Sequence, residues 1–128
     1  VMMEWQFDSN MPIYTQLVDK IKLAIVSGEY TRGQRLSAVR DLAAEAGVNP
    51  NTMQRAFQEL ERLGLVYTQR SSGRFVTEDE NMIEAAKKAL AEENIRSFMD
   101  SMRRIGYTRE DIIRLLESGE KEDSNGNT

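Results

Sequence analysis

A cluster of side chains in the middle of the chain has the chemistry to bind nucleic acid. The cluster comprises Asn49, Asn51, Thr52, Gln54 and Arg55. Amides and hydroxyls of this length can donate to and accept from base edges or phosphates, and arginine can bind a phosphate or the edge of a guanine. An ordinary solvated helix face with a good N-cap is the alternative interpretation of the same residues.

Catalytic chemistry has much weaker support. The chain contains no cysteine and no histidine, so disulfides, thiol nucleophiles, imidazole bases and the zinc sites built from those ligands are excluded. No carboxylate pair, nucleophile–base pair or phosphate-binding loop stands out in the sequence. We therefore expect a protein that is not an enzyme and that carries no cofactor and no metal.

The cluster lies at the start of an expected helix. Asn49 can cap this helix and Pro50 suits its first turn, where no amide hydrogen is needed. We expect the helix over residues 50–63, ending at Gly64. Its buried stripe would consist of Met53, Ala56, Phe57, Leu60 and Leu63, which leaves the polar cluster on the opposite side.

Two more helices are expected before it. The first spans residues 11–28, with apolar residues at four-residue spacing until Gly28. The second is short, is capped by Ser37 and ends at Gly47. Two helices joined across Gly47-Val48, the second opening with small polar residues, have the proportions of a helix-turn-helix, whose second helix enters the major groove.

A basic hairpin is expected directly after this helix pair. Residues 65–68 and 75–77 are short runs that favour β-strand, and Arg70, Ser71, Ser72, Gly73 and Arg74 join them. Such a wing could lie against the DNA backbone or probe the minor groove. A basic hairpin alone is usually only a soluble turn, but a helix pair followed by a basic hairpin is far more specific.

The charge of the chain is unevenly distributed. The net charge is −4, yet residues 32–74 hold seven arginines against four acidic residues, giving +3, while residues 79–128 hold eight basic and twelve acidic residues, giving −4. A local basic patch on an acidic chain fits one module that meets phosphates and another with a different task. Arg40 belongs to this patch, and we expect it to contact phosphate rather than pair with Asp41 or Glu45.

The remainder of the chain is expected to be helical. One long helix spans residues 79–105, with a possible bend at Glu92-Glu93-Asn94, and a second begins at Thr108 with an Asp111 capping box and stops near Gly119. Residues 120–128 are polar and without periodicity, so we expect a disordered tail. The apolar positions in these two helices are Leu90, Ile95, Phe98, Met102, Ile105, Ile112, Leu115 and Leu116.

Two helices of this length cannot enclose a large core, so these apolar faces predict a homodimer. Folding back onto the chain's own winged domain is the alternative. Two copies would read two half-sites of an inverted-repeat operator in double-stranded DNA. A small-molecule effector in the dimer crevice stays open, although no pocket for it can be named.

An ordered set of residues resembles the GntR family of bacterial regulators, and within it the short YtrA-like branch. The resemblance rests on Pro12-Ile13-Tyr14, Gln16-Leu17, Ile25, Gly28, Gly33, Leu36, Arg40, Leu42-Ala43, Gly47-Val48-Asn49-Pro50-Asn51-Thr52, Ala56, Leu60-Glu61, Leu63-Gly64-Leu65, Arg70, Gly73 and Phe75-Val76. It implies DNA contacts at Arg40, at the start of the third helix and at the wing from Arg70 to Gly73. It also implies a dimer and, by analogy only, control of genes such as those for membrane transporters.

Three positions depart from the family pattern. Arg32-Gly33 stands where Pro-Gly is usual, Ser37-Ala38 where Pro-Ser is usual, and Ser71 where the wing has its first glycine. These departures affect the approach of the second helix and the shape of the wing, but the DNA-contacting donors remain.

We therefore expect a mainly α fold with a small β-hairpin. Residues 8–78 would form a winged helix-turn-helix DNA-binding domain and residues 79–119 a helical dimerisation segment. With no apolar run of membrane-spanning length and no leader, the sequence predicts a cytoplasmic bacterial regulator, most simply a repressor. The competing hypothesis is a winged-helix module that binds another protein and not DNA.

Overall fold

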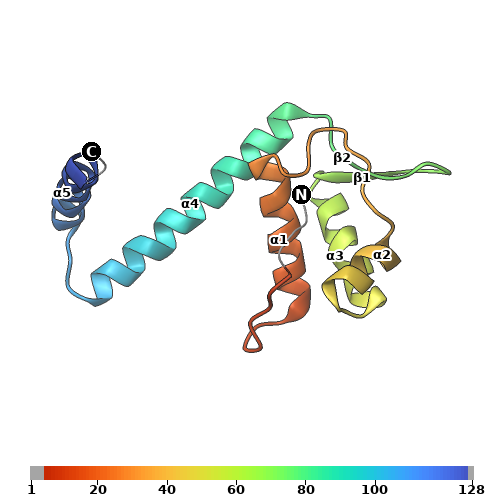
Figure 1. Ribbon diagram of the computed structural model, residues 1–128, viewed down its shortest axis with the longest axis horizontal. Helices are drawn as coiled ribbons and strands as arrows, with labels where there is room; N and C mark the ends of the chain where they lie inside the picture. Colours follow the sequence, from red (N-terminus) through yellow and green to blue (C-terminus); the bar gives the residue numbers. More distant parts are fainter. Residues whose placement is uncertain (1–4, 127–128) are drawn as a thin grey trace. The chain divides into compact units, whose positions relative to one another are not determined.

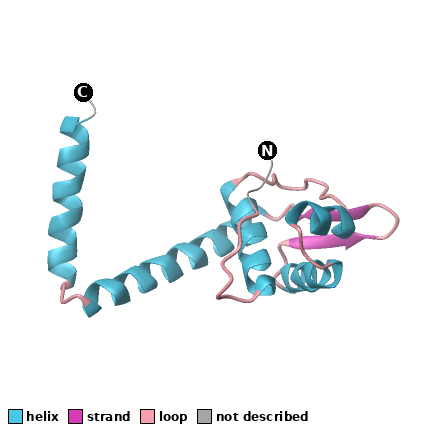
Figure 2. Cartoon of the chain, turned by 60° about the horizontal axis from the view of Figure 1, so that its bottom comes forward, coloured by secondary structure: helices cyan, strands magenta, loops and turns pink. Residues whose placement is uncertain are grey.

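The computed structural model describes residues 5–126, which form five helices and one hairpin (Figure 1; Figure 2). The chain divides into two compact units, one ending at Lys87 and one beginning at Lys88, so the boundary falls inside the long helix. The fold is mainly helical, as the sequence predicted. The elements are α1 (Ile13–Ser27), α2 (Val39–Ala46), α3 (Pro50–Arg62), β1 (Val66–Gln69), β2 (Gly73–Val76), α4 (Glu80–Arg104) and α5 (Arg109–Gly126).

The core of the first unit is built mainly from apolar stripes on α1 and α3. Leu17 and Ile21 of α1 and Met53 and Phe57 of α3 have no solvent exposure. Both stripes recur at three- and four-residue spacing, so each helix presents one apolar face to the other. This packing leaves the opposite face of α3 available at the surface.

Two glycines end helices as the sequence predicted. Gly28 closes α1 with φ 87° and Gly47 closes α2 with φ 71°. This left-handed backbone region is accessible to glycine without steric cost. The turn at Gly47 therefore brings the chain directly from α2 into Asn49 and the start of α3.

The predicted capping role of Ser37 is wrong. Helix α2 begins at Val39, its N-cap is Ala38, and no side chain caps it. The chain before it is drawn into the wing instead, because the Leu36 amide donates to the Arg74 carbonyl at 2.8 Å. Residues 34–36 are thereby held extended beside β2, which delays the start of the helix.

The wing is an antiparallel hairpin of β1 and β2 in a two-stranded sheet. Its register pairs Val66 with Val76 and Gln69 with Gly73. The rings of Tyr67 and Phe75 stack across the pair with centroids 5.5 Å apart. Such cross-strand aromatic pairs stabilise a short hairpin that has few ladder hydrogen bonds.

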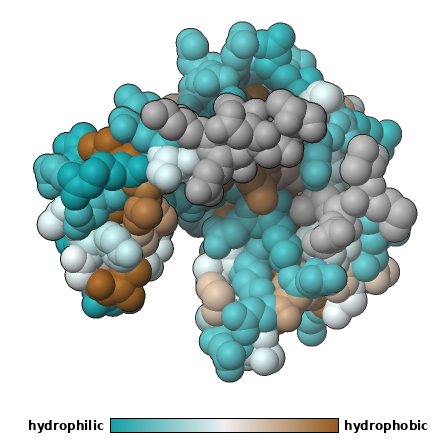
Figure 3. Space-filling view, turned by 60° about the vertical axis from the view of Figure 1, so that its left-hand side comes forward, coloured by the Kyte–Doolittle hydropathy of each residue, from teal (hydrophilic) through white to brown (hydrophobic). Residues whose placement is uncertain are grey.

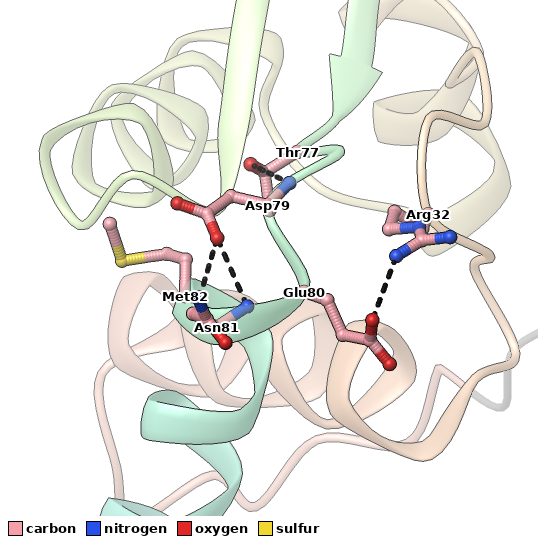
Figure 4. Close-up of polar contacts among 6 residues, drawn as sticks. All are labelled: Arg32, Thr77, Asp79, Glu80, Asn81 and Met82. Atoms are coloured by element: carbon pink, nitrogen blue, oxygen red, sulfur yellow. Dashed lines mark hydrogen bonds and ion pairs between the residues drawn. The ribbon is translucent and has the colours of Figure 1, made fainter.

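The start of α4 is tied to the first unit by polar contacts (Figure 4). The Asp79 carboxylate accepts from the amides of Asn81 and Met82 at 3.0 and 3.3 Å, which caps the helix. Arg32 donates to the Glu80 carboxylate at 3.1 Å. The first turns of α4 therefore belong to the winged unit, which extends beyond the expected boundary at residue 78.

The second unit contains the rest of α4 and α5. Helix α4 is continuous through Glu92–Asn94, so the structure assigns no helix break there. Helix α5 passes through Gly119 to Gly126, so the expected stop at Gly119 is wrong, as is the disordered tail over residues 120–126; residues 127–128 lie outside the described part. The reason is that a glycine inside a helix costs only about 1 kcal/mol, while glutamate and lysine are good helix formers. None of the described helices has an apolar stretch long enough to cross a membrane.

The capping box at the start of α5 is confirmed. The Thr108 amide donates to the Asp111 carboxylate at 2.9 Å, and the Asp111 amide donates to the Thr108 hydroxyl at 3.1 Å. The hydrogen bond from the Thr108 backbone is the main cause that lowers the pKa of Asp111. Two amides that would lack partners at the helix end are thereby satisfied.

Replacing Thr108 by alanine should destabilise the first turn of α5. The Asp111 amide loses its acceptor, a change that typically costs about 1 kcal/mol at a helix N-cap. Hydrogen exchange at the Asp111 amide should accelerate roughly fivefold, because 1.4 kcal/mol corresponds to about tenfold. Thr108→Ser, which keeps the oxygen, is the matched control. Equal exchange in both variants would contradict the capping role.

Candidate nucleic-acid interface

Helix α3 begins as the sequence predicted. Asn49 is the N-cap, and its side-chain oxygen accepts from the Asn51 amide at 2.8 Å. Pro50 occupies the first helical position, where its missing amide hydrogen has no cost. The positive end of the helix dipole makes this end attractive to a phosphate.

The polar cluster lies on the outer side of α3. Asn49, Asn51 and Arg55 are exposed, and Thr52 and Gln54 are partly exposed. The opposite stripe, with Met53, Ala56, Phe57 and Leu60, is fully buried. The structure therefore brings all five predicted residues of this cluster to one end of α3 without burying any of them in its own unit.

Arg74 of the wing turns toward α3. Its guanidinium donates to the Gln54 side-chain oxygen and to the Glu61 carboxylate, both at 3.3 Å. It also lies over the Phe57 ring, 5.6 Å from the centroid. From the sequence, Arg74 was expected beside the wing tip together with Arg70. In the structure its partners, Gln54 and Glu61, lie on α3.

The tip of the wing is open to solvent. Arg70, Ser71 and Ser72 are exposed, and the Ser72 amide donates to the Gln69 carbonyl at 3.1 Å. Ser71 has φ 71°, a left-handed backbone conformation that is uncommon for residues other than glycine. Serine thus adopts the backbone conformation that glycine accommodates without cost.

Two further arginines lie on α2 and just before it. Arg40 is exposed on α2 and makes no ion pair with any described residue, Asp41 and Glu45 included. The Arg35 side chain lies beside Gly73 of the wing. A Cβ atom added at Gly73 would be 3.3 Å from the Arg35 Nε. Sequence reasoning counted Arg35 in the basic stretch but did not assign it to the site, since its pairing with the hairpin is not visible in the sequence.

Arg55 is held by an aromatic ring from another helix. Its guanidinium carbon lies 4.5 Å from the centroid of the Tyr14 ring on α1. A cation–π contact of this kind orients the guanidinium while leaving its edge N–H groups able to donate. Tyr14 therefore positions Arg55, a role that sequence spacing did not reveal.

The arginines of the first unit differ in whether they have a carboxylate partner. At the C-terminal end of α3, Arg62 pairs with Glu59 at 2.5 Å, and its hydrogen bond is the main cause that lowers the pKa of Glu59. Arg35 before α2, Arg40 on α2 and Arg70 on the wing make no ion pair with a described residue. The chain has no His or Cys, and among the side chains that the structure describes, residues 5–119, no group of three or more carboxylates could hold a metal ion. The arrangement is a set of hydrogen-bond donors and positive charges suited to a polyanion.

Comparison with known proteins identifies the family. Residues 13–76 match the family described as bacterial regulatory proteins, gntR family. The uncharacterized HTH-type transcriptional regulator YhcF of Bacillus subtilis is 39% identical over 111 residues, which cover 87% of this chain and 92% of the relative. The HTH-type transcriptional repressor YtrA of the same organism is 32% identical over 97 residues, covering 76% of this chain and 70% of YtrA.

A solved structure agrees with this match over most of the chain. The GntR family transcriptional regulator from Listeria monocytogenes superposes with a TM-score of 0.82 and 39% identity, covering 88% of this chain and 98% of that one. The family match spans α1 to β2, the elements that carry the polar cluster and the wing. The chain therefore belongs to the gntR family and is a DNA-binding transcriptional regulator with a winged helix-turn-helix.

Proposed function

We propose that this regulator is a dimeric repressor that binds an inverted-repeat operator, with α3 in the major groove and the wing against the DNA backbone. The observation that carries the proposal is the contrast between the two faces of α3. One face is buried in the core, while the other presents the amide and hydroxyl cluster together with Arg55, which makes no ion pair with a described residue. In this proposal residues 8–78 bind DNA, the first turns of α4 up to Lys87 belong to the same unit, and the dimerisation segment predicted over residues 79–119 acts through its part beyond Lys87.

The contacts divide into two kinds. Asn51, Thr52 and Gln54 lie in the first turns of α3 and are assigned to base edges. The phosphate contacts are assigned to Arg40, Arg55 and the wing from Arg70 to Gly73, with Asn49 at the helix end and Arg35 added from the structure. Phosphate contacts orient the protein on the duplex, and base contacts select the sequence.

The dimer is assigned to the apolar surface of the second unit. Ile95, Phe98 and Ile105 of α4 are 60, 45 and 68% exposed, and Leu115 and Leu116 of α5 are 49 and 57% exposed. Figure 3 shows apolar patches of this kind, in brown, on a surface that is otherwise largely polar. Contiguous exposed apolar residues at helical spacing are typical of an oligomer interface. A second copy would cover them and double the number of half-sites read.

Three other predicted dimerisation residues are less exposed. Leu90 and Met102 are partly buried within the chain, and Ile112 is only 4% exposed. Ile112 is therefore covered by its own chain and is not available at the surface. Its contribution to a dimer is indirect, through the placement of Leu115 and Leu116 on the same helix.

The repressor assignment rests on the named relative YtrA and on a simple physical mechanism. A dimer seated on an operator that overlaps a promoter excludes other proteins from the same stretch of duplex.

Binding to duplex DNA should fall steeply as salt rises. If a dimer neutralises about eight phosphates, the logarithm of the association constant falls with the logarithm of salt at a slope of about −7. Fluorescence anisotropy with a labelled duplex between low and moderate salt measures that slope. An operator for this test comes from selecting bound fragments out of random duplex DNA. Absence of binding at every salt concentration would instead favour the protein-binding module.

A further inference from the structure

The side chain of Gln54 has a defined orientation on the reading face. Arg74 donates through Nη2 to the Gln54 side-chain oxygen at 3.3 Å. A guanidinium contains only donors, so the amide atom that faces it must be the oxygen and not the nitrogen. The amide plane of Gln54 is thereby set by a residue of the wing.

Arg74 is itself held in place from several sides. Its Nε donates to the Glu61 carboxylate at 3.3 Å, and Thr68 of β1 donates to the same carboxylate oxygen at 2.5 Å. Its guanidinium lies over the Phe57 ring, and its side chain is only 22% exposed. A guanidinium with this many partners has little freedom to rotate away from Gln54.

The consequence is an edge at Gln54 that is biased toward donation. The oxygen keeps a second lone pair but is turned toward Arg74, and the group of Gln54 left without any partner in the described structure is the Nε2 amino group. An unrestrained glutamine pairs with adenine by using its oxygen and nitrogen together, on the adenine N6 and N7 atoms. A glutamine that offers only N–H groups is better matched to the two acceptors of guanine, O6 and N7.

We propose that Arg74 determines the base preference of Gln54 by holding its amide as a hydrogen-bond donor, so that Gln54 selects guanine over adenine at one base pair of each half-site. Arg74 is a positioning residue in this proposal and need not touch DNA. The inference rests on the proposed reading role of α3, and it adds a specificity determinant located on the wing.

The test is selection of bound duplexes from a random pool, followed by sequencing, with wild type and Arg74→Met. Methionine keeps the packing over Phe57 but has no donor. The wild type should show guanine enriched over adenine at one position per half-site. In Arg74→Met the guanine-to-adenine ratio at that position should fall about tenfold, because each bidentate pair discriminates by about 1–3 kcal/mol.

Two further variants identify the residue through which Arg74 acts. Gln54→Ala should lose the guanine–adenine distinction at that same position, and adding Arg74→Met to it should cause no further change there. A loss confined to overall affinity, with the base profile of Arg74→Met unchanged, would overturn the inference. So would a change at positions that Gln54→Ala leaves unaffected.

The controls separate this inference from the proposed function and from misfolding. Arg62→Met removes another arginine–carboxylate pair of α3, at the end away from Gln54, and should leave the profile unchanged. Arg74→Lys keeps a charge and donors and should retain most of the guanine preference. If Arg74→Met does not fold, Arg74→Leu, which also lacks a donor, should show the same shift, and an unchanged profile in a folded Arg74→Leu overturns the inference. A wild-type protein that enriches no sequence contradicts the proposed function, whereas an enriched sequence without the guanine preference contradicts only the role of Arg74.

Discussion

Replacing Arg40 and Arg70 together by alanine should reduce affinity for every duplex, whatever its sequence, by about 1,000-fold. In a dimer this double variant removes four phosphate contacts, and at about 1 kcal/mol for each contact the loss is roughly 4 kcal/mol. The salt slope should become shallower by about 4, since each contact contributes close to 1. Anisotropy titrations with the operator and with an unrelated duplex measure both quantities.

The control for this double variant removes the same number of positive charges from another part of the surface. Arg96 and Arg104 are exposed on α4, and neither makes an ion pair with a residue whose side chain is described. Replacing both with alanine should leave the salt slope within about 1 of the wild-type value. If the two double variants lose affinity equally, the overall charge of the protein governs binding, and the placement of Arg40 and Arg70 is irrelevant.

Much of the winged unit could be predicted from local signals in the sequence. Asn49 and Pro50 specify the start of α3 through backbone chemistry that involves only neighbouring residues, and the structure confirms both roles. The glycine ends of α1 and α2 and the capping box of Thr108 and Asp111 are equally local, and each is confirmed. The apolar stripe of α3 follows from helical spacing alone.

The features that sequence reasoning missed depend on contacts between residues far apart in the chain. Ser37 is a good capping residue, but pairing of the preceding segment with β2 delays the helix beyond it. The partners of Arg74 lie 13 and 20 residues away on α3, so nothing near Arg74 in the sequence announces them. At Gly119 a local signal was overestimated, because neighbouring residues with high helix propensity outweigh one glycine.

These missed contacts change how the reading surface works. Sequence reasoning treated α3 and the wing as separate elements that each contact DNA. In the structure Thr68 and Arg74 of the wing both contact Glu61 of α3, so the two elements form one polar network. A substitution in the wing can therefore alter base selection by the helix without touching a base.

Recognition of an inverted-repeat operator also requires a dimer. A charge introduced into the apolar face of α4 should dissociate that dimer. Phe98→Asp places a carboxylate between Ile95 and Met102 on the exposed stripe of α4. Burying an unpaired charge costs several kcal/mol, so the protein shifts to the monomer instead. We expect the dimer dissociation constant to rise at least 100-fold in sedimentation equilibrium, while the far-ultraviolet circular dichroism stays that of a folded helical protein.

The same variant separates recognition by one copy from recognition by two. Affinity for a duplex with both half-sites should fall at least 100-fold, because the second half-site no longer adds to the first. Affinity for a single half-site should stay within about threefold, since α3 and the wing are unchanged. Ser97→Asp adds the same charge about a third of a turn around α4, on an exposed position outside the stripe, and should leave the dimer intact. If Phe98→Asp remains dimeric, this apolar face is not the interface, and the copies must associate through another surface.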